Sequence, residues 1–289
     1  MEVHTLTPQL EREYGGFLRR TPGGLLYHSL PYRDLLQRLL GCRAEYLVAV
    51  AEETIVGALP LMFVEGERGR VYNSLPYYGS HGGILAESET ARDLLAARYR
   101  AIVLQSETLA ATLVENPFAP VDVELPRTHV DRRIGQITPL PAGDDPRTAI
   151  LEHCEASTRR NVRKAERKGF QLAIDASYLG ELREIHEDNM RAIGGRAKQP
   201  AFFEIVPEVF RENDEFDVYA VLDGPRVAAA LLVFYFGQTV EYFTPAVRQE
   251  YRSQQPLALA LITAMEDAAR RGLRVWNWGG TWESQTGVY

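Results

Sequence analysis

Apolar and polar residues alternate along this chain in patterns that predict a mixed α/β protein. Residues 46–63 and 217–234 each read as a short apolar strand, a polar turn and a second apolar strand, which is typical of a β-hairpin. Shifted by 171 residues without gaps, the two segments match at six positions. The matched pairs are Ala49/Ala220, Val50/Val221, Val56/Val227, Ala58/Ala229, Leu61/Leu232 and Phe63/Phe234. A repeat of this kind indicates a duplicated domain.

The elements that surround the hairpins repeat as well. Helical spacing of apolar residues predicts a helix before each hairpin, and a strand and a second helix after it. The predicted helices are 29–40, 90–104, 179–193 and 256–271, and the predicted strands are 70–74, 239–247 and 273–278. Residues 139–147 contain three prolines and a glycine and are predicted to be a linker. The predicted domains are therefore residues 1–143 and 144–289.

Composition narrows the class of protein. With 45% hydrophobic and 25% charged residues, the chain is neither disordered nor fibrous. The net charge of −7 disfavours nucleic-acid binding by the whole surface. The spacing of Cys42 and Cys154 is unlike a metal site, so we predict no metal and a reducing, cytoplasmic location. No signal peptide pattern is visible, and the longest apolar run has ten residues where a membrane span needs about 20.

Several common catalytic motifs are absent. There is no glycine-rich dinucleotide fingerprint and no phosphate loop. His81-Gly82-Gly83 is similar to the oxyanion loop of some esterases, but no Gly-x-Ser-x-Gly supplies the nucleophile. A serine hydrolase is therefore unsupported.

A basic segment, residues 157–169, stands out in an acidic protein. On a helix its basic residues form two adjacent rows, which Ser157 or Thr158 would cap at the start and Gly169 would end. The six residues are Arg159, Arg160, Arg163, Lys164, Arg167 and Lys168. Two interpretations stay open: a solvated helix face, or a stripe that binds the phosphates of a nucleic acid or nucleotide sugar.

Three further segments are candidate ligand sites. Residues 75–83 (LPYYGSHGG) place Tyr77 and Tyr78 in a glycine-rich loop, where an ordinary turn is the alternative. Arg196 lies in a glycine-broken segment and has the geometry to clamp a phosphate or carboxylate, unless it is simply an exposed loop arginine. Asn277 and Trp278 lie in WNWGGTW, which forms either a groove wall or ordinary packing.

These segments, in this order, resemble the Fem (FemABX-like) aminoacyltransferases. The resemblance rests on Tyr27-His28-Ser29, LPYYGSHGG, STRRNVRKAERKG, MRAIGGR and RGLRVWNWGGT, and it covers essentially the whole chain. It implies an α/β fold with two tandem GNAT-like domains, each a mixed central sheet flanked by helices. It also implies transfer of an acyl or aminoacyl group to an amine, with Ser29 among the substrate-binding residues.

By position, the resemblance makes Arg196 the arginine that holds the acceptor's phosphates and Tyr242 a tyrosine that contacts the acceptor. Glu241 and Tyr242 are the candidate catalytic residues, and Asp217 is a further candidate base; proton transfer assisted by the substrate itself is the alternative. Two features depart from the family. The turn that would present N–H groups to the pyrophosphate of acyl-CoA reads RSQQPL, without glycine and with Pro256. The family's basic and aromatic continuation is expected after Tyr289, where this sequence ends.

Three hypotheses follow. The first is transfer from aminoacyl-tRNA to an amine acceptor, either a peptidoglycan precursor or a small molecule, with the basic segment on the RNA. The second is an acyl-CoA-dependent N-acetyltransferase of the same fold. The third is a catalytically silent tandem domain that binds a glycan or peptide. No resident cofactor is expected; in the first two hypotheses the donor, aminoacyl-tRNA or acyl-CoA, is a co-substrate.

Overall fold

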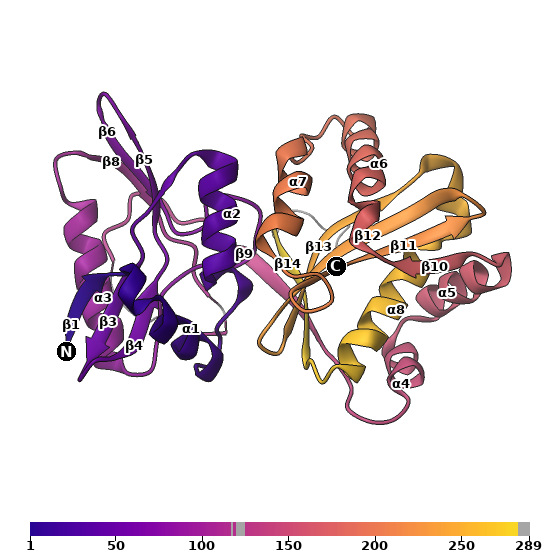
Figure 1. Cartoon of the computed structure of the whole chain (residues 1–289), viewed down its shortest axis with the longest axis horizontal. Coiled ribbons are helices and arrows are strands. Elements are labelled where there is room, and N and C mark those ends of the chain that lie inside the picture. Colours follow the sequence, from indigo (N-terminus) through magenta and orange to yellow (C-terminus); the bar gives the residue numbers. More distant parts are fainter. Residues whose placement is uncertain (117, 120–124, 283–289) are drawn as a thin grey trace. The chain divides into compact units, whose positions relative to one another are not determined.

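The computed structural model describes residues 1–116, 118–119 and 125–282, which form two compact units (Figure 1). Among the described residues, unit 1 consists of those up to Gly135 and of 280–282, and unit 2 of Gln136–Gly279. The sequence placed the division after residue 143. Residues 136–143 belong to unit 2 because strand β9 (Arg133–Pro139) joins the sheet of that unit. The predicted linker is therefore a connection inside unit 2.

Unit 1 is built from short strands in two sheets with helices packed against them. Its helices are α1 (Glu11–Arg20), α2 (Leu30–Leu40) and α3 (Glu89–Val103), with 3-10 turns η1 (Pro8–Leu10) and η2 (Leu26–His28). Its strands are β1 (Glu2–Thr5), β2 (Arg43–Ala44), β3 (Leu47–Ala51), β4 (Thr54–Leu59), β5 (Met62–Gly66), β6 (Gly69–Asn73), β7 (Leu85–Ala86) and β8 (Thr108–Thr112). The strand orders are β1-β3-β4-β7 and β2-β5-β6-β8.

Unit 2 has one six-stranded sheet in the order β10-β11-β12-β13-β14-β9. Besides β9, its strands are β10 (Gln171–Ile174), β11 (Phe216–Asp223), β12 (Arg226–Phe236), β13 (Thr239–Val247) and β14 (Val275–Trp282). Its helices are α4 (Pro146–His153), α5 (Ala156–Lys168), α6 (Leu179–Ala192), α7 (Pro200–Val209) and α8 (Pro256–Arg270), with 3-10 turns η3 (Ala176–Tyr178) and η4 (Gln249–Gln254).

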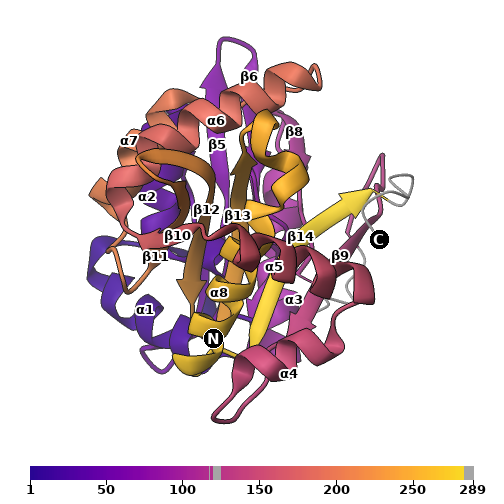
Figure 2. The ribbon, with the colours of Figure 1, turned by 90° about the vertical axis from the view of Figure 1, so that its right-hand side faces the viewer.

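Helices cover both faces of the unit 2 sheet. Helices α6 and α7 lie over one face, and α8 with α4 and α5 lies over the other (Figures 1 and 2). Nine consecutive residues of β12, Val227–Tyr235, are buried. A strand covered on both faces is expected to be apolar throughout, which explains why the longest apolar run of the sequence lies here.

Both predicted hairpins are confirmed, but their predicted register was wrong by one residue. The turn between β3 and β4 is Glu52-Glu53, and the turn between β11 and β12 is Gly224-Pro225, a separation of 172 residues. The β-bulges after Ala49 and after Val221 are also 172 residues apart. Because side chains alternate along a strand, a slip of one residue assigns every matched side chain to the opposite face.

The two units share a strand order, with one interruption. The order β10-β11-β12-β13-β14 of unit 2 corresponds to β1-β3-β4 followed by β5-β6-β8 in unit 1. Pro60, which has no N–H to donate, separates β4 from β5 at the point where β12 runs on without a break. The repeat predicted from the sequence therefore exists, and the first copy has its sheet divided in two.

Candidate functional site

Strands β13 and β14 of unit 2 run parallel, pair briefly and then separate. Their pairs are Thr239 with Val275, Val240 with Trp276 and Glu241 with Asn277. Beyond this last pair, β13 continues to Val247 and β14 to Trp282, and the described residues form no further pairs between them. The unpaired strand edges leave main-chain N–H and C=O groups that an extended ligand can bind. We call this feature the strand opening.

The corresponding strands of unit 1 have no such opening. Parallel pairs between β6 and β8 extend from Arg70 with Thr108 to Asn73 with Thr112, which is almost the whole of β6. Among the described parallel strand pairs, the one in unit 2 alone offers unpaired edges.

A β-bulge at Phe243 lies just beyond the start of the opening. Leu232 pairs with Thr244 and Val233 with Tyr242, so Phe243 is the extra residue. Its ring stacks on Phe202 of α7, with centroids 5.5 Å apart. A bulge bends a strand and changes the direction of its side chains, and the ring contact holds this one against α7.

Glu241 and Asn277 lie side by side where the opening begins. Asn277 Nδ2 donates to Glu241 Oε2 over 2.8 Å, and the N–H of Gly279 donates to Asn277 Oδ1 over 2.9 Å. Both side chains are buried. The Gly279 contact fixes the amide orientation, so that Asn277 turns its donor toward the carboxylate. This pair is a buried polar contact at the start of the opening.

Tyr242 faces the other side of the sheet from Glu241. It packs against Trp276 and Trp278 on the α8 side, with ring centroids 6.3 and 5.1 Å apart. Burial raises the pKa of Tyr242 well above its usual value, so its hydroxyl stays protonated at neutral pH. The structure thus places the two predicted catalytic residues on opposite faces of β13. It places Trp278 beside Tyr242, with its indole N–H donating to Thr138 over 2.9 Å.

Helix α6 holds the far end of the opening. Asn189 Nδ2 donates to the carbonyl of Val247 over 2.9 Å, and the N–H of Val247 donates to Asn189 Oδ1 over 3.1 Å. The side-chain amide replaces a neighbouring strand at this point. The opening is therefore limited by Glu241 and Asn277 at one end and by Asn189 at the other.

The segment between α6 and α7 brings a lysine to the bulge. Lys198 is 7% exposed, and its Nζ lies 3.5 Å from the carbonyl oxygen of Phe243 and 5.2 Å from the centre of that ring. Burial lowers the pKa of Lys198 to about 8. The sequence instead selected Arg196, two residues earlier, which is exposed. Nothing in the local sequence distinguishes the buried cation from the exposed one.

His186 of α6 fixes the main chain at this lysine. The backbone N–H of Lys198 donates to His186 Nε2 over 3.1 Å. Burial, followed by the nearby Lys198 charge, lowers the pKa of His186 to about 4, so the ring is neutral and accepts a hydrogen bond at neutral pH. Neither His186 nor Lys198 was predicted to be a site residue.

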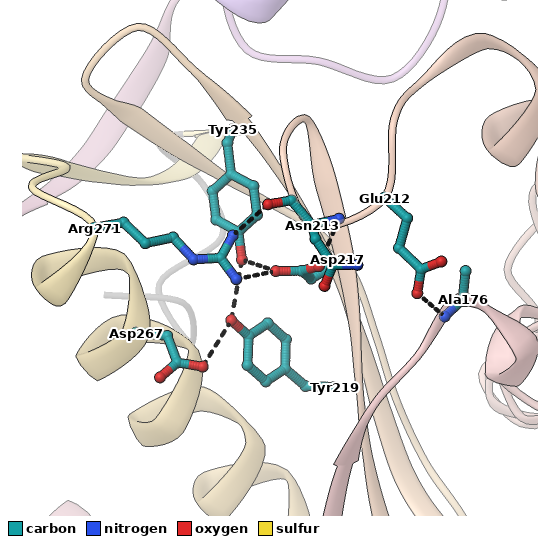
Figure 3. Close-up of polar contacts among 8 residues, drawn as sticks. All are labelled: Ala176, Glu212, Asn213, Asp217, Tyr219, Tyr235, Asp267 and Arg271. Atoms are coloured by element: carbon teal, nitrogen blue, oxygen red, sulfur yellow. Dashed lines mark hydrogen bonds and ion pairs between the residues drawn. The ribbon is translucent and has the colours of Figure 1, made fainter.

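Asp217, the further candidate base, is held in a separate network (Figure 3). Its Oδ2 accepts from Arg271 Nη2 over 2.6 Å and from the Tyr235 hydroxyl over 2.9 Å, and its Oδ1 accepts from the N–H of Asn213 over 3.2 Å. Tyr219 links Tyr235 to Asp267. With its acceptor positions occupied, Asp217 has a structural role rather than that of a proton acceptor for a substrate.

Helix α5 carries the predicted basic stripe. The helix begins after Glu155 and ends at Gly169, which has a φ of 78°; the end is confirmed, whereas Ser157 and Thr158 lie inside the helix and the predicted cap was wrong. Arg159 is half-buried and donates to the carbonyls of Leu151 and Cys154. The exposed basic residues are Arg160, Arg163, Lys164, Arg167 and Lys168. We call these five residues the α5 basic face.

The remaining predicted substrate-binding residues lie in unit 1. Ser29 is buried, and its Oγ caps α2 by accepting from the N–H of Tyr32 over 3.2 Å. Tyr77 and Tyr78 meet edge to face with ring centroids 4.8 Å apart, and the Tyr32 hydroxyl donates to the carbonyl of Tyr78. Ser29 thus shapes the loop indirectly, whereas Tyr78 is exposed to solvent.

Among the described residues, no helix has the length and apolar content to cross a bilayer. Residues 154–284 match the Acetyltransferase (GNAT) domain family. No curated protein matches the sequence.

Solved structures resemble the chain over nearly all of its length. The crystal structure of FemX matches with a TM-score of 0.77 at 16% identity, over 98% of this chain and 90% of FemX. A tandem GNAT protein from the clavulanic acid biosynthesis pathway matches with a TM-score of 0.54 at 13% identity, over 99% and 91%. The C-terminal domain of a putative lysylphosphatidylglycerol synthetase from Agrobacterium fabrum matches with a TM-score of 0.53 at 11% identity, over 94% and 78%.

The domain match falls on the unit whose parallel strands separate, and the structural likenesses extend over both units. The predicted α/β fold with two GNAT-like domains is confirmed. The chain thus has a tandem GNAT fold like that of FemX, and its second unit carries the match to the Acetyltransferase (GNAT) domain family.

Proposed function

We propose that the protein transfers an aminoacyl group from aminoacyl-tRNA to an amine acceptor and that the reaction takes place at the strand opening of unit 2. The observation that supports this proposal best is the opening itself, where β13 and β14 no longer pair with each other and the Glu241–Asn277 pair lies at the start. An extended acyl or aminoacyl group has the shape to lie between two such edges. Binding there would hold the reactive ester in one orientation.

The proposed donor follows from the charges around this unit. The α5 basic face presents five cations in a protein whose net charge is −7, and such a cluster attracts a polyanion. The turn before α8 supports RNA over coenzyme A. Gln255 has a φ of 62° and Pro256 opens the helix, so the turn has neither the glycines nor the full set of N–H donors that a pyrophosphate needs.

In the proposed reaction, the acceptor amine attacks the ester carbon, the new C–N bond forms and the tRNA hydroxyl leaves. The ester is already activated, so placing the two groups in contact supplies much of the rate enhancement. Tyr242, with its proton retained, is able to donate a hydrogen bond to a substrate but not to act as a base. Arg196 and the Asn277–Trp278 segment are proposed to bind the acceptor.

A transfer assay tests this proposal. Purified protein is mixed with tRNA charged with radiolabelled amino acids and with a panel of amines, including a peptidoglycan precursor. We expect label to appear in an amide and ribonuclease to abolish its formation. Transfer that survives ribonuclease would contradict the use of tRNA.

The alternative function is acyl-CoA-dependent N-acetylation. The match of residues 154–284 to the Acetyltransferase (GNAT) domain supports this alternative. Calorimetry with acetyl-CoA separates the two. Binding at micromolar concentration would favour the acetyltransferase, whereas no heat at millimolar concentration would leave the tRNA-dependent reaction.

A further inference from the structure

Lysine is rare in this protein, and one lysine is buried. Of the 32 lysines and arginines, only Lys164, Lys168 and Lys198 are lysine. The first two are exposed on α5, and Lys198 is 7% exposed. An arginine keeps its charge at every accessible pH, whereas a lysine amine can lose its proton. The chain thus has a titratable amine in the interior and charges its surface almost entirely with arginine.

The position of this amine connects it with the strand opening. Its Nζ lies 3.5 Å from the carbonyl oxygen of Phe243, the bulge residue of β13. Glu241 lies on the same face of β13, because its cross-strand partner Phe234 packs edge to face with Phe243. The hydrogen bond from the backbone of Lys198 to His186 holds the segment there.

We propose that Lys198, in its neutral form, is the proton acceptor for the attacking amine in the transfer reaction. This inference rests on the proposed function. In the step, the acceptor nitrogen bonds to the ester carbon and passes its proton to Nζ, which becomes an ammonium. The C–O bond to the donor then breaks, and the leaving oxygen takes the proton from that ammonium. Atoms and charge balance, and Lys198 returns to its neutral form.

The surroundings of Lys198 favour this role over that of a permanent cation. Burial lowers its pKa to about 8, so the neutral amine is accessible near physiological pH. The titratable group that the described contacts place against this segment is His186 on α6, which accepts from the N–H of Lys198. His186 is neutral in this range, because burial holds its pKa near 4.

The first test measures the amine directly. Protein labelled with ¹³C only in lysine gives three side-chain signals, and Lys198→Met identifies one by its loss. We expect the Lys198 signal to titrate near pH 8, and those of Lys164 and Lys168 near the usual value of about 10.4. Titration of all three signals above pH 10 would overturn the proposal.

The second test distinguishes two roles of Lys198, proton acceptor and permanent positive charge. Lys198→Met removes both functions, whereas Lys198→Arg keeps the charge and removes the base. We expect each variant to lose at least 100-fold in kcat/KM, while Gln199→Met, which changes the exposed neighbour, retains activity. Near wild-type activity of Lys198→Arg would overturn the proposal and assign a charge-stabilising role.

A pH profile completes the test. With an acceptor amine that is already neutral at pH 6, kcat/KM of the wild type should rise with a midpoint near 8 and then level off. A fall in rate above pH 8 would contradict the proposal. No transfer by the wild type from tRNA or acyl-CoA donors would overturn the proposed function as well, whereas equal rates for wild type and Lys198→Met would overturn only the role of Lys198.

Discussion

The buried carboxylate of Asp217 in unit 2 depends on its ion-pair partner, Arg271. This carboxylate is fully buried, and Arg271, whose side chain is 34% exposed, supplies the balancing charge through a 2.6 Å contact (Figure 3). Arg271 also lies over the ring of Tyr235, at 4.7 Å. A buried charge that loses its partner is costly, because its hydration is lost and nothing replaces it.

We therefore expect Arg271→Met to lower the free energy of unfolding by about 2–4 kcal/mol, measured by urea denaturation. The neighbouring Arg270 is the matched control. It pairs with Glu266 but is largely exposed, so Arg270→Met should cost less than about 1 kcal/mol. Equal losses for the two variants would show that the Asp217 charge does not depend on Arg271.

For single residues, the sequence indicated which side chains have suitable chemistry, but it did not indicate which of them are buried or which partners they contact. Arg196 and Lys198 are two residues apart in a segment without regular structure, where no periodicity indicates which side chain turns inward. Glu241 and Asn277 were both selected, but their contact depends on strand pairing between residues 36 apart. Asp217 was a candidate base from its type alone, and the three donors around it come from distant parts of the chain.

Among the secondary-structure elements, α5 has the clearest separation of faces. Val162 and Ala165 are its buried residues, and five basic side chains point outward. Arg159, which the sequence grouped with them, is instead turned toward the end of α4. A helix of this kind binds its ligand through exposed charge, so binding should weaken as salt rises.

The triple change Arg160→Glu, Arg163→Glu and Arg167→Glu should weaken binding of charged tRNA and reduce the slope of log affinity against log salt by about two to three. Filter binding at several salt concentrations measures both. The matched control is Arg12→Glu, Arg68→Glu and Arg98→Glu, which makes the same charge change on exposed residues of unit 1. If both triple variants bind equally, the α5 basic face is only a solvated surface.

Element positions followed from the sequence because apolar spacing and end signals agreed. Helix α2 begins after Ser29 and ends at Gly41, α8 begins at Pro256, and β13 has the predicted bounds. The register between the two hairpins was not predicted correctly from the sequence. Both hairpins are rich in small apolar residues, and such strands match almost as well when displaced by one residue. Turn positions and bulges, which only the structure shows, fix the displacement at 172.

Across the whole molecule, three buried histidines link stability to pH. Burial lowers the pKa of His28 and His81 in unit 1 to about 4, as it does for His186 in unit 2. In the unfolded chain these side chains titrate near 6.5. Between pH 6.5 and 4 the unfolded state therefore binds more protons than the folded state, and stability falls as the pH falls.

We expect the free energy of unfolding to be nearly constant between about pH 7 and 8 and to decrease below 6.5, with His28 alone contributing about 2 kcal/mol by pH 5. Urea denaturation at pH 7.5 and pH 5 measures the difference. His28→Gln should reduce the pH dependence, whereas a change at the exposed His153 should leave it unaltered. Equal stability of the wild type at the two pH values would contradict this expectation.

The closed pairing of β6 with β8 predicts how many donor molecules one chain binds, if the strand opening is the donor site. A duplicated fold suggests two equivalent sites per chain, but the first copy has its parallel strands paired along almost their full described length. Titration with a non-hydrolysable donor analogue should therefore give one equivalent bound per chain. The second copy would then turn over independently of any neighbour, with a hyperbolic dependence of rate on donor concentration and no cooperativity.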